Sequence, residues 1–245
     1  MQCKLCLQNK SLLKQSHIIP NFLYKELLKK DGFFVEGNLK KISSKILQTG
    51  VFDRYILCAE CDNNLLSKLE SYAYQVLYDI KKVKGTNLAN EINQNGVEWT
   101  MARGVDYKTF KLFLLSLLWR FSISKQQVFN GVNLGSHEEK IRRMIFEDDP
   151  REILDYPCAI SSYKHHSDLP FQIISQPLKH RNELSGNCYS ILINGLIFTF
   201  NISKNLTPDY ISEIAINKNN ELKIIRMPRD NAIKIIRKYM GLPNK

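Results

Sequence analysis

The chain has 245 residues, of which 44% are hydrophobic, enough apolar content for one sizeable core or two smaller ones. The longest apolar run, residues 113–121, is too short to cross a bilayer, and no apolar segment follows the first residues. We therefore expect no membrane span, no secretory signal and a reducing cytoplasm. Thirty-five Lys and Arg against 24 Asp and Glu give a formal charge of +11, which fits a polyanionic partner but equally a lysine-rich solvated surface.

The first 82 residues contain two CxxC pairs, in the stretches CKLC and ILCAEC, with SHIIP between them. Residues 21–30 place apolar side chains at helical spacing and predict a short helix. Directly after the second pair, residues 63–82 carry the apolar pattern of an amphipathic helix. These features predict one cysteine-bearing segment with two helices.

Residues 83–105 are polar and rich in Asn and Gly, which predicts a linker with one strand near residues 97–101. Residues 106–123 are apolar on nearly all sides and predict a buried helix. A further helix is expected to begin with a capping box of Ser136 and Glu139 and to end before Pro150.

From about residue 157 the apolar pattern changes to the period of two that is typical of strands. Asn194-Gly195 joins two such runs and is a strong hairpin signal, residues 211–227 predict a second hairpin, and residues 230–240 predict a final helix. We therefore expect an α+β fold with a module at 1–82, a linker at 83–105 and a second module at 106–245, in which helices precede antiparallel strands.

Four of the six cysteines have the spacing of metal ligands. Two CxxC pairs supply four thiolates, the pattern of a closed tetrahedral zinc site that leaves no position for catalysis. Such a site would close the 51 residues between the pairs; the alternative is a set of unconnected reduced thiols. The candidate zinc ligands are Cys3, Cys6, Cys58 and Cys61, whereas Cys158 and Cys188 have no such spacing and are interpreted as buried apolar residues.

The combination of CKLC, SHIIP and FDRYILCAECDNN resembles the HNH endonucleases of the ββα-metal class that carry a four-cysteine zinc site, and its layout is similar to phage resolvases of the endonuclease VII type. The resemblance covers about the first 75 residues. It implies a zinc-bound ββα-metal module, DNA as substrate with RNA not excluded, and a bacterial or phage setting such as anti-phage defence or a mobile element.

The resemblance assigns roles to three residues. His17 matches the general base that takes a proton from the attacking water, and Asp53 matches the middle position, which holds the loop bearing the base. Asp62 matches the last position, which binds the catalytic Mg²⁺ or Mn²⁺, with Asn63 as the substitute ligand. The alternative for Asp62 is an N-cap of the following helix.

Two departures from the family pattern bear on activity. Ser16 stands where many relatives have an acidic metal ligand, and Asp62 stands where His or Asn is usual. A carboxylate at Asp62 offsets the one missing before His17, since Mg²⁺ needs only one or two carboxylates and keeps several waters. Glu70 would lie about 12 Å from Asp62 along an ideal helix, which indicates a structural or outer role.

The sequence thus favours a cytoplasmic, metal-dependent HNH-type DNA endonuclease, with residues 106–245 as an accessory module for targeting, for a protein partner or for homo-oligomer contact. The alternative is a non-catalytic four-cysteine zinc protein with a degenerate HNH core that binds nucleic acid or a partner. Ser16 favours the alternative, whereas His17 and Asp62 together favour the enzyme.

Overall fold

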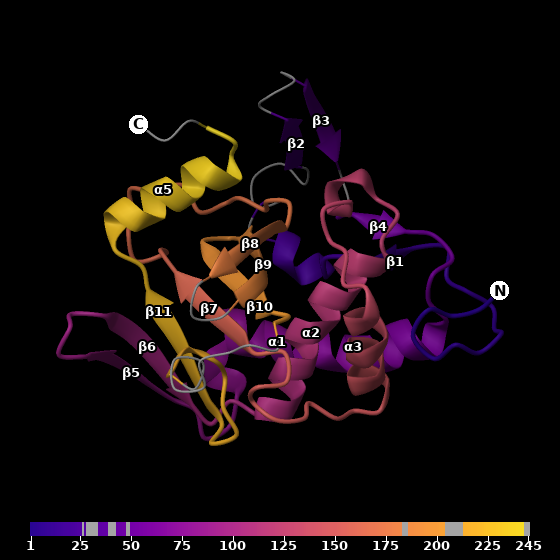
Figure 1. The fold of residues 1–245 in the computed structure, drawn as a ribbon, viewed down its shortest axis with the longest axis horizontal. Coiled ribbons are helices and arrows are strands. Elements are labelled where there is room, and N and C mark those ends of the chain that lie inside the picture. Colours follow the sequence, from indigo (N-terminus) through magenta and orange to yellow (C-terminus); the bar gives the residue numbers. More distant parts are fainter. Residues whose placement is uncertain are drawn as a thin grey trace.

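A computed structural model describes residues 1–25, 27, 34–38, 43–47, 50–182, 186–203 and 213–242 (Figure 1). The fold is mixed α+β, as the sequence predicts, with a small N-terminal strand pair, a separate hairpin and a seven-stranded sheet. Within the described residues, no helix combines the length and apolar character needed to cross a membrane.

The N-terminal segment places two very short strands before a long helical stretch. Strand β1 (Ser16–His17) pairs antiparallel with β4 (Phe52–Asp53), so that Ser16 lies opposite Asp53 and His17 opposite Phe52. The helical stretch begins as a π-helix over Glu60–Leu66 and continues as α1 (Ser67–Tyr78), followed by a 3₁₀ turn over Ile80–Lys82. The helix predicted after the second CxxC pair is confirmed, but its first turns are π-helical.

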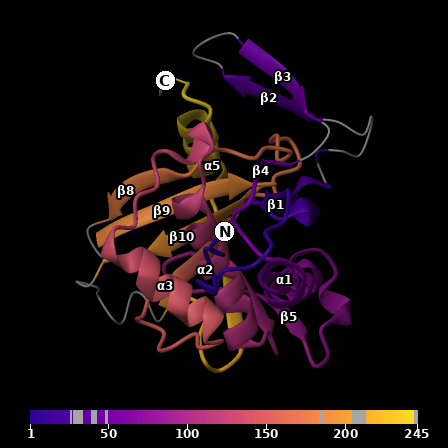
Figure 2. The ribbon, with the colours of Figure 1, turned by 90° about the vertical axis from the view of Figure 1, so that its right-hand side faces the viewer.

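Between β1 and β4 the chain makes an excursion that contains the start of the helix predicted over residues 21–30 and a strand pair that was not predicted. A 3₁₀-helix spans Asn21–Tyr24, and strands β2 (Phe34–Asn38) and β3 (Ser43–Leu47) form an antiparallel pair that projects from the body of the fold (Figures 1 and 2). The later part of the helix predicted over residues 21–30 falls largely outside the described residues.

The large sheet has the strand order β5-β6-β11-β7-β10-β9-β8, and only the β11–β7 pair is parallel. Its strands are β5 (Asn87–Ile92), β6 (Glu98–Arg103), β7 (Cys158–Ser162), β8 (Leu178–Asn182), β9 (Gly186–Ile193), β10 (Leu196–Asn201) and β11 (Glu221–Arg226). The predicted β9–β10 hairpin is confirmed: Asn194 and Gly195 have φ of 50° and 75°, the left-handed values that such a two-residue turn requires.

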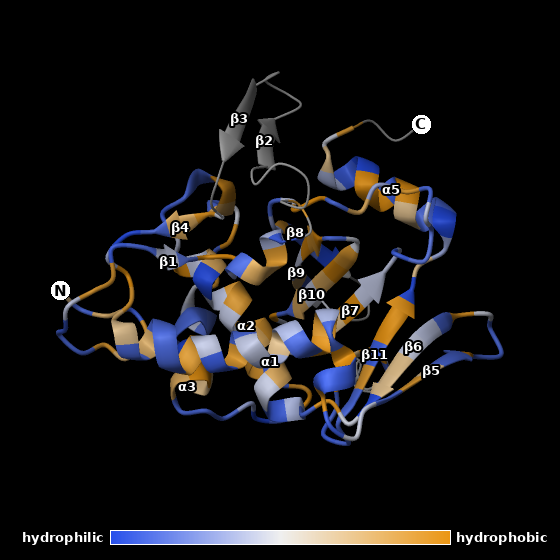
Figure 3. Cartoon of the chain, turned by 180° about the vertical axis from the view of Figure 1, so that it is seen from behind, coloured by the Kyte–Doolittle hydropathy of each residue, from blue (hydrophilic) through white to orange (hydrophobic). Residues whose placement is uncertain are grey.

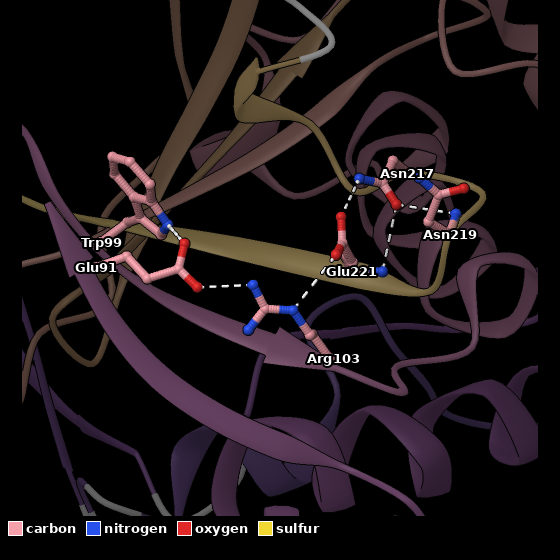
Figure 4. A network of polar contacts seen from close by, with 6 residues as sticks. All are labelled: Glu91, Trp99, Arg103, Asn217, Asn219 and Glu221. Carbon is pink, nitrogen blue, oxygen red and sulfur yellow. Dashed lines mark hydrogen bonds and ion pairs between the residues drawn. The ribbon is translucent and has the colours of Figure 1, made fainter. Parts of the chain in front are cut away.

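Most of residues 83–105, predicted as a linker with one strand near residues 97–101, form β5 and β6 at one edge of the large sheet, so the predicted strand is confirmed as β6 whereas β5 was not predicted. Strand β6 also pairs with β11, more than 100 residues later in the chain. Arg103 of β6 contacts Glu91 of β5 at 2.7 Å and Glu221 of β11 at 3.5 Å, so side chains as well as backbone connect the three strands (Figure 4). Polar composition misled the prediction, since an edge hairpin keeps many side chains in water.

Two further predictions need correction. The second hairpin does not form, because β11 pairs with β6 and β7, and the described residues before it make only isolated bridges such as Asn217 to Glu221. The predicted capping box is also absent: helix α3 (Ser136–Phe146) follows Gly135 as its N-cap, and Glu139 pairs with Arg142 instead.

Helices cover both faces of the sheet (Figure 2). Helix α2 (Tyr107–Ile123) is buried on nearly all sides, as predicted, and its N-cap Asp106 accepts a hydrogen bond from Thr109 N at 2.8 Å. Helix α5 (Arg229–Tyr239) covers the opposite face and combines hydrophobic and hydrophilic residues along its length (Figure 3).

One continuous apolar core connects the cysteine-bearing segment to the rest of the chain. It contains Leu57 and Leu69 from the N-terminal segment together with Phe113 of α2 and Phe198 of β10. The expected boundary at residues 83–105 is therefore not a break in the packing. Helix α2 lies at the centre of this core and contributes two buried cations, Lys111 and Arg120.

Candidate functional site

The four cysteines of the two CxxC pairs converge at one point. Their sulfur atoms all lie within 4.8 Å of one another; Cys6 is half-buried and the other three are buried. Backbone hydrogen bonds join the two segments, from Lys4 N to Ile56 O and from Leu13 N to Leu57 O, both 2.9 Å. Four convergent thiols from two tight turns can hold a metal ion such as zinc.

The electrostatics of this cluster also suit a cation. Although burial opposes it, backbone N–H groups of Cys6, Cys58 and Leu5 lower the pKa of Cys3 to about 7. Burial raises the pKa of the Cys58 and Cys61 thiols. Four thiols this close cannot all ionise without a compensating positive charge, which a bound divalent ion supplies.

Helix α3 contacts the cysteine cluster from the C-terminal part of the chain. Arg142, which is buried, donates a hydrogen bond to the carbonyl of Leu5 between the first two cysteines, while its guanidinium also pairs with Glu139 at 2.6 Å. On the other side, Lys10 pairs with Glu60 at the start of the π-helix. The cluster is thus packed into the fold rather than carried on a free loop.

His17 lies on β1 and is half-buried, close enough to Asp62 and Glu70 of the helical stretch for their charges to act on it. Burial lowers the pKa of His17, while Glu70 and Asp62 raise it in part and Arg120 lowers it further. Because the pKa of His17 lies below its ordinary value of 6.5, the imidazole is neutral near pH 7. A neutral ring is the form that a general base requires.

Asp62 is the third residue of the π-helix and does not cap it. The N-cap is Ala59, and no side chain makes a capping hydrogen bond there. Burial raises the pKa of Asp62, against which the Ser16 hydroxyl, Arg120 and His17 lower it. The alternative that Asp62 is an N-cap is therefore wrong, and its carboxylate lies in the same electrostatic environment as His17.

Ser16, next to His17, has a hydroxyl with no ordinary partner. Its side chain is fully buried, and Oγ has no hydrogen-bond partner of good geometry among the described residues, although it is close enough to lower the pKa of Asp62. Buried hydroxyls are normally satisfied. The Ser16 hydroxyl therefore lies beside the Asp62 carboxylate without a hydrogen bond of good geometry.

Glu70 and Arg120 complete the surroundings of His17. Glu70 raises the pKa of both His17 and Asp62, so it acts on the site despite the separation expected along an ideal helix. The π-helical turns over Glu60–Leu66 depart from that ideal geometry, and such turns are frequent at functional sites. Arg120 pairs with Glu70 at 2.6 Å. Arg120 was not among the predicted site residues, although a charged residue inside an apolar helix indicates a buried partner.

Asp53 and Asn63, the other two predicted site residues, are not among the groups that shift the pKa of His17. Asp53 is buried, and its carboxylate accepts hydrogen bonds from Lys125 N at 2.8 Å and from Gln126 Nε2 at 2.9 Å, which attach β4 to the chain after α2. Asn63 is exposed, and its side chain makes no hydrogen bond within the described part of the chain. A loop-holding role for Asp53 remains a prediction, as does a ligand role for Asn63.

Among the residues that the structure describes, no second group of three His, Cys, Asp or Glu side chains converges as the four cysteines do. Comparisons with protein-family models, with curated proteins and with solved structures found no match to this chain. The site must therefore be interpreted from its own residues.

Proposed function

We propose that the chain is a metal-dependent HNH-type endonuclease that hydrolyses DNA phosphodiester bonds. The observation that carries the proposal is the position of His17 on a two-strand pair, close enough to Asp62 in the following helix for the two groups to interact electrostatically, together with four convergent cysteines in the same segment. The formal charge of +11 fits a nucleic-acid substrate.

In this proposal His17 takes a proton from the attacking water, for which its lowered pKa keeps it neutral at pH 7. Asp62, with the unsatisfied Ser16 hydroxyl beside it, supplies the oxygen atoms that would hold Mg²⁺ or Mn²⁺, and water completes the coordination. The ion, when bound, neutralises charge on the phosphate and on the leaving oxygen. The cysteines would hold a structural zinc.

A second candidate is a non-catalytic zinc protein that binds nucleic acid or a protein partner. Two observations favour it: Ser16 replaces an acidic ligand, and the described residues provide no second convergent ligand group. The two candidates differ in whether purified protein cuts DNA.

A plasmid-nicking assay tests the proposal, with Mg²⁺ or Mn²⁺ against EDTA. His17→Ala should lower the cleavage rate by roughly 10²–10⁴-fold while DNA binding is retained. The matched control is His165→Ala, an exposed histidine in the loop after β7, which should cut as the wild type does. A folded His17→Ala protein that nicks at the wild-type rate would contradict the proposal, and wild-type protein that binds but never cuts DNA would favour the binding protein.

A further inference from the structure

We infer that Arg120 is a positioning residue of the candidate site: from α2 it holds both the His17 carbonyl and the Glu70 carboxylate, and so sets where the His17 ring lies relative to Asp62. This inference rests on the proposed function. It makes the site depend on a residue outside the segment that resembles an HNH module.

The contacts of Arg120 join three elements. Its Nη1 donates to Glu70 Oε1 of α1 at 2.6 Å and to the backbone carbonyl of His17 in β1 at 3.2 Å. Nε and Nη2 donate to the carbonyl and the hydroxyl of Ser116, one turn earlier in α2, each at 3.2 Å. A planar guanidinium bound on three sides has little freedom to rotate.

The carbonyl of His17 is one of few points that fix this strand. Strand β1 has only two residues, and its backbone pairs solely with β4 in the described structure, with a further bond from Ile18 N to Val51 O at 2.9 Å. Arg120 therefore holds the peptide group that directly follows the His17 side chain. Loss of this contact frees the strand to shift relative to α1.

Stability alone does not account for the placement of this pair. Arg120 is fully buried, while the Glu70 side chain is 25% exposed, and the desolvation of a buried ion pair offsets most of its Coulombic gain. What distinguishes the pair is its location, since both charges act on His17 and on Asp62. A positioning role explains why an arginine interrupts an apolar helix at this point.

The test uses the double variant Arg120→Met Glu70→Gln in the full chain, which removes both charges and leaves no unpaired ion. Zinc content and thermal melting report the fold, ¹H–¹³C spectra of the histidine rings report the position of His17, and plasmid nicking reports cleavage. We expect retained zinc and cooperative melting, shifted His17 ring signals and about 10²-fold slower nicking, the scale of loss that follows from small misplacement of a reacting group.

The control is Arg103→Met Glu91→Gln, which removes a partly exposed ion pair of 2.7 Å at the β5–β6 edge (Figure 4). It should leave nicking and the His17 signals unchanged.

A folded Arg120→Met Glu70→Gln protein that nicks at the wild-type rate would overturn the inference. If the wild type does not cut at all, the nuclease proposal fails, and unmoved His17 ring signals in the double variant would then overturn the positioning role independently. If the double variant does not fold, Arg120→Lys replaces it with the same readouts, because lysine keeps the charge but cannot bind both partners as a fork.

Discussion

Lys111, the other buried cation of α2, should make the stability of the protein depend on pH in the alkaline range. Its side chain is 1% exposed, and its Nζ donates to Tyr107 Oη at 2.9 Å and to the Glu152 carbonyl at 2.6 Å. Burial lowers the pKa of Lys111 from 10.5 to about 8, against which the nearby Cys158, Asp155 and Glu152 raise it slightly. Lys111→Met removes this titration and keeps an unbranched side chain of similar size.

The magnitude follows from the difference between the two pKa values. The folded protein releases the Lys111 proton at a lower pH than the unfolded chain, so the unfolded chain binds more protons between about pH 8 and 10.5, and wild-type stability rises with pH in this range. At 1.36 kcal/mol per pKa unit, the wild type should gain about 3 kcal/mol relative to Lys111→Met between pH 7 and pH 10.5. For a chain of this length, that is a relative shift in melting temperature of about 6–12 °C.

Denaturant unfolding of both proteins at pH 7 and pH 10.5 measures this gain as a difference of differences, in which titrations common to the two proteins cancel. Lys108→Met is the matched control, because Lys108 lies one turn away on α2, is 46% exposed and pairs with Asp148 at 2.5 Å. Its stability should run parallel to that of the wild type. Parallel curves for Lys111→Met as well would refute the buried environment assigned to Lys111, and with it the central packing of α2.

Two further predictions concern the candidate site. Purified protein should contain one zinc per chain, and Cys58→Ser Cys61→Ser should contain less than half an equivalent by metal analysis; full zinc retention in that variant would contradict a four-cysteine site. Asp62→Ala should melt without the loss of about 1 kcal/mol that removal of an N-cap causes, because Ala59 occupies the N-cap position. A fall in melting temperature of about 2–4 °C or more in calorimetry would contradict that assignment.

Local patterns in the sequence were sufficient for several elements. Periodicity and turn chemistry within a few consecutive residues determine the conformation of these elements. They are helix α2, the Asn194-Gly195 turn and the helix after the second CxxC pair. The four-cysteine cluster was also predicted, because two CxxC pairs supply the four ligands of a tetrahedral metal site.

The tertiary structure decided which distant segments meet. A strand near residues 97–101 was predicted, but its pairing with β11 was not, because no local pattern specifies a partner more than 100 residues away. The same holds for Arg120, whose partners Glu70 and His17 are 50 and 103 residues distant in the chain. The physical reason is that strand pairing and the burial of charge depend on the whole core: a charged side chain in an apolar helix shows that a partner exists, whereas only the packed fold determines which residue it is.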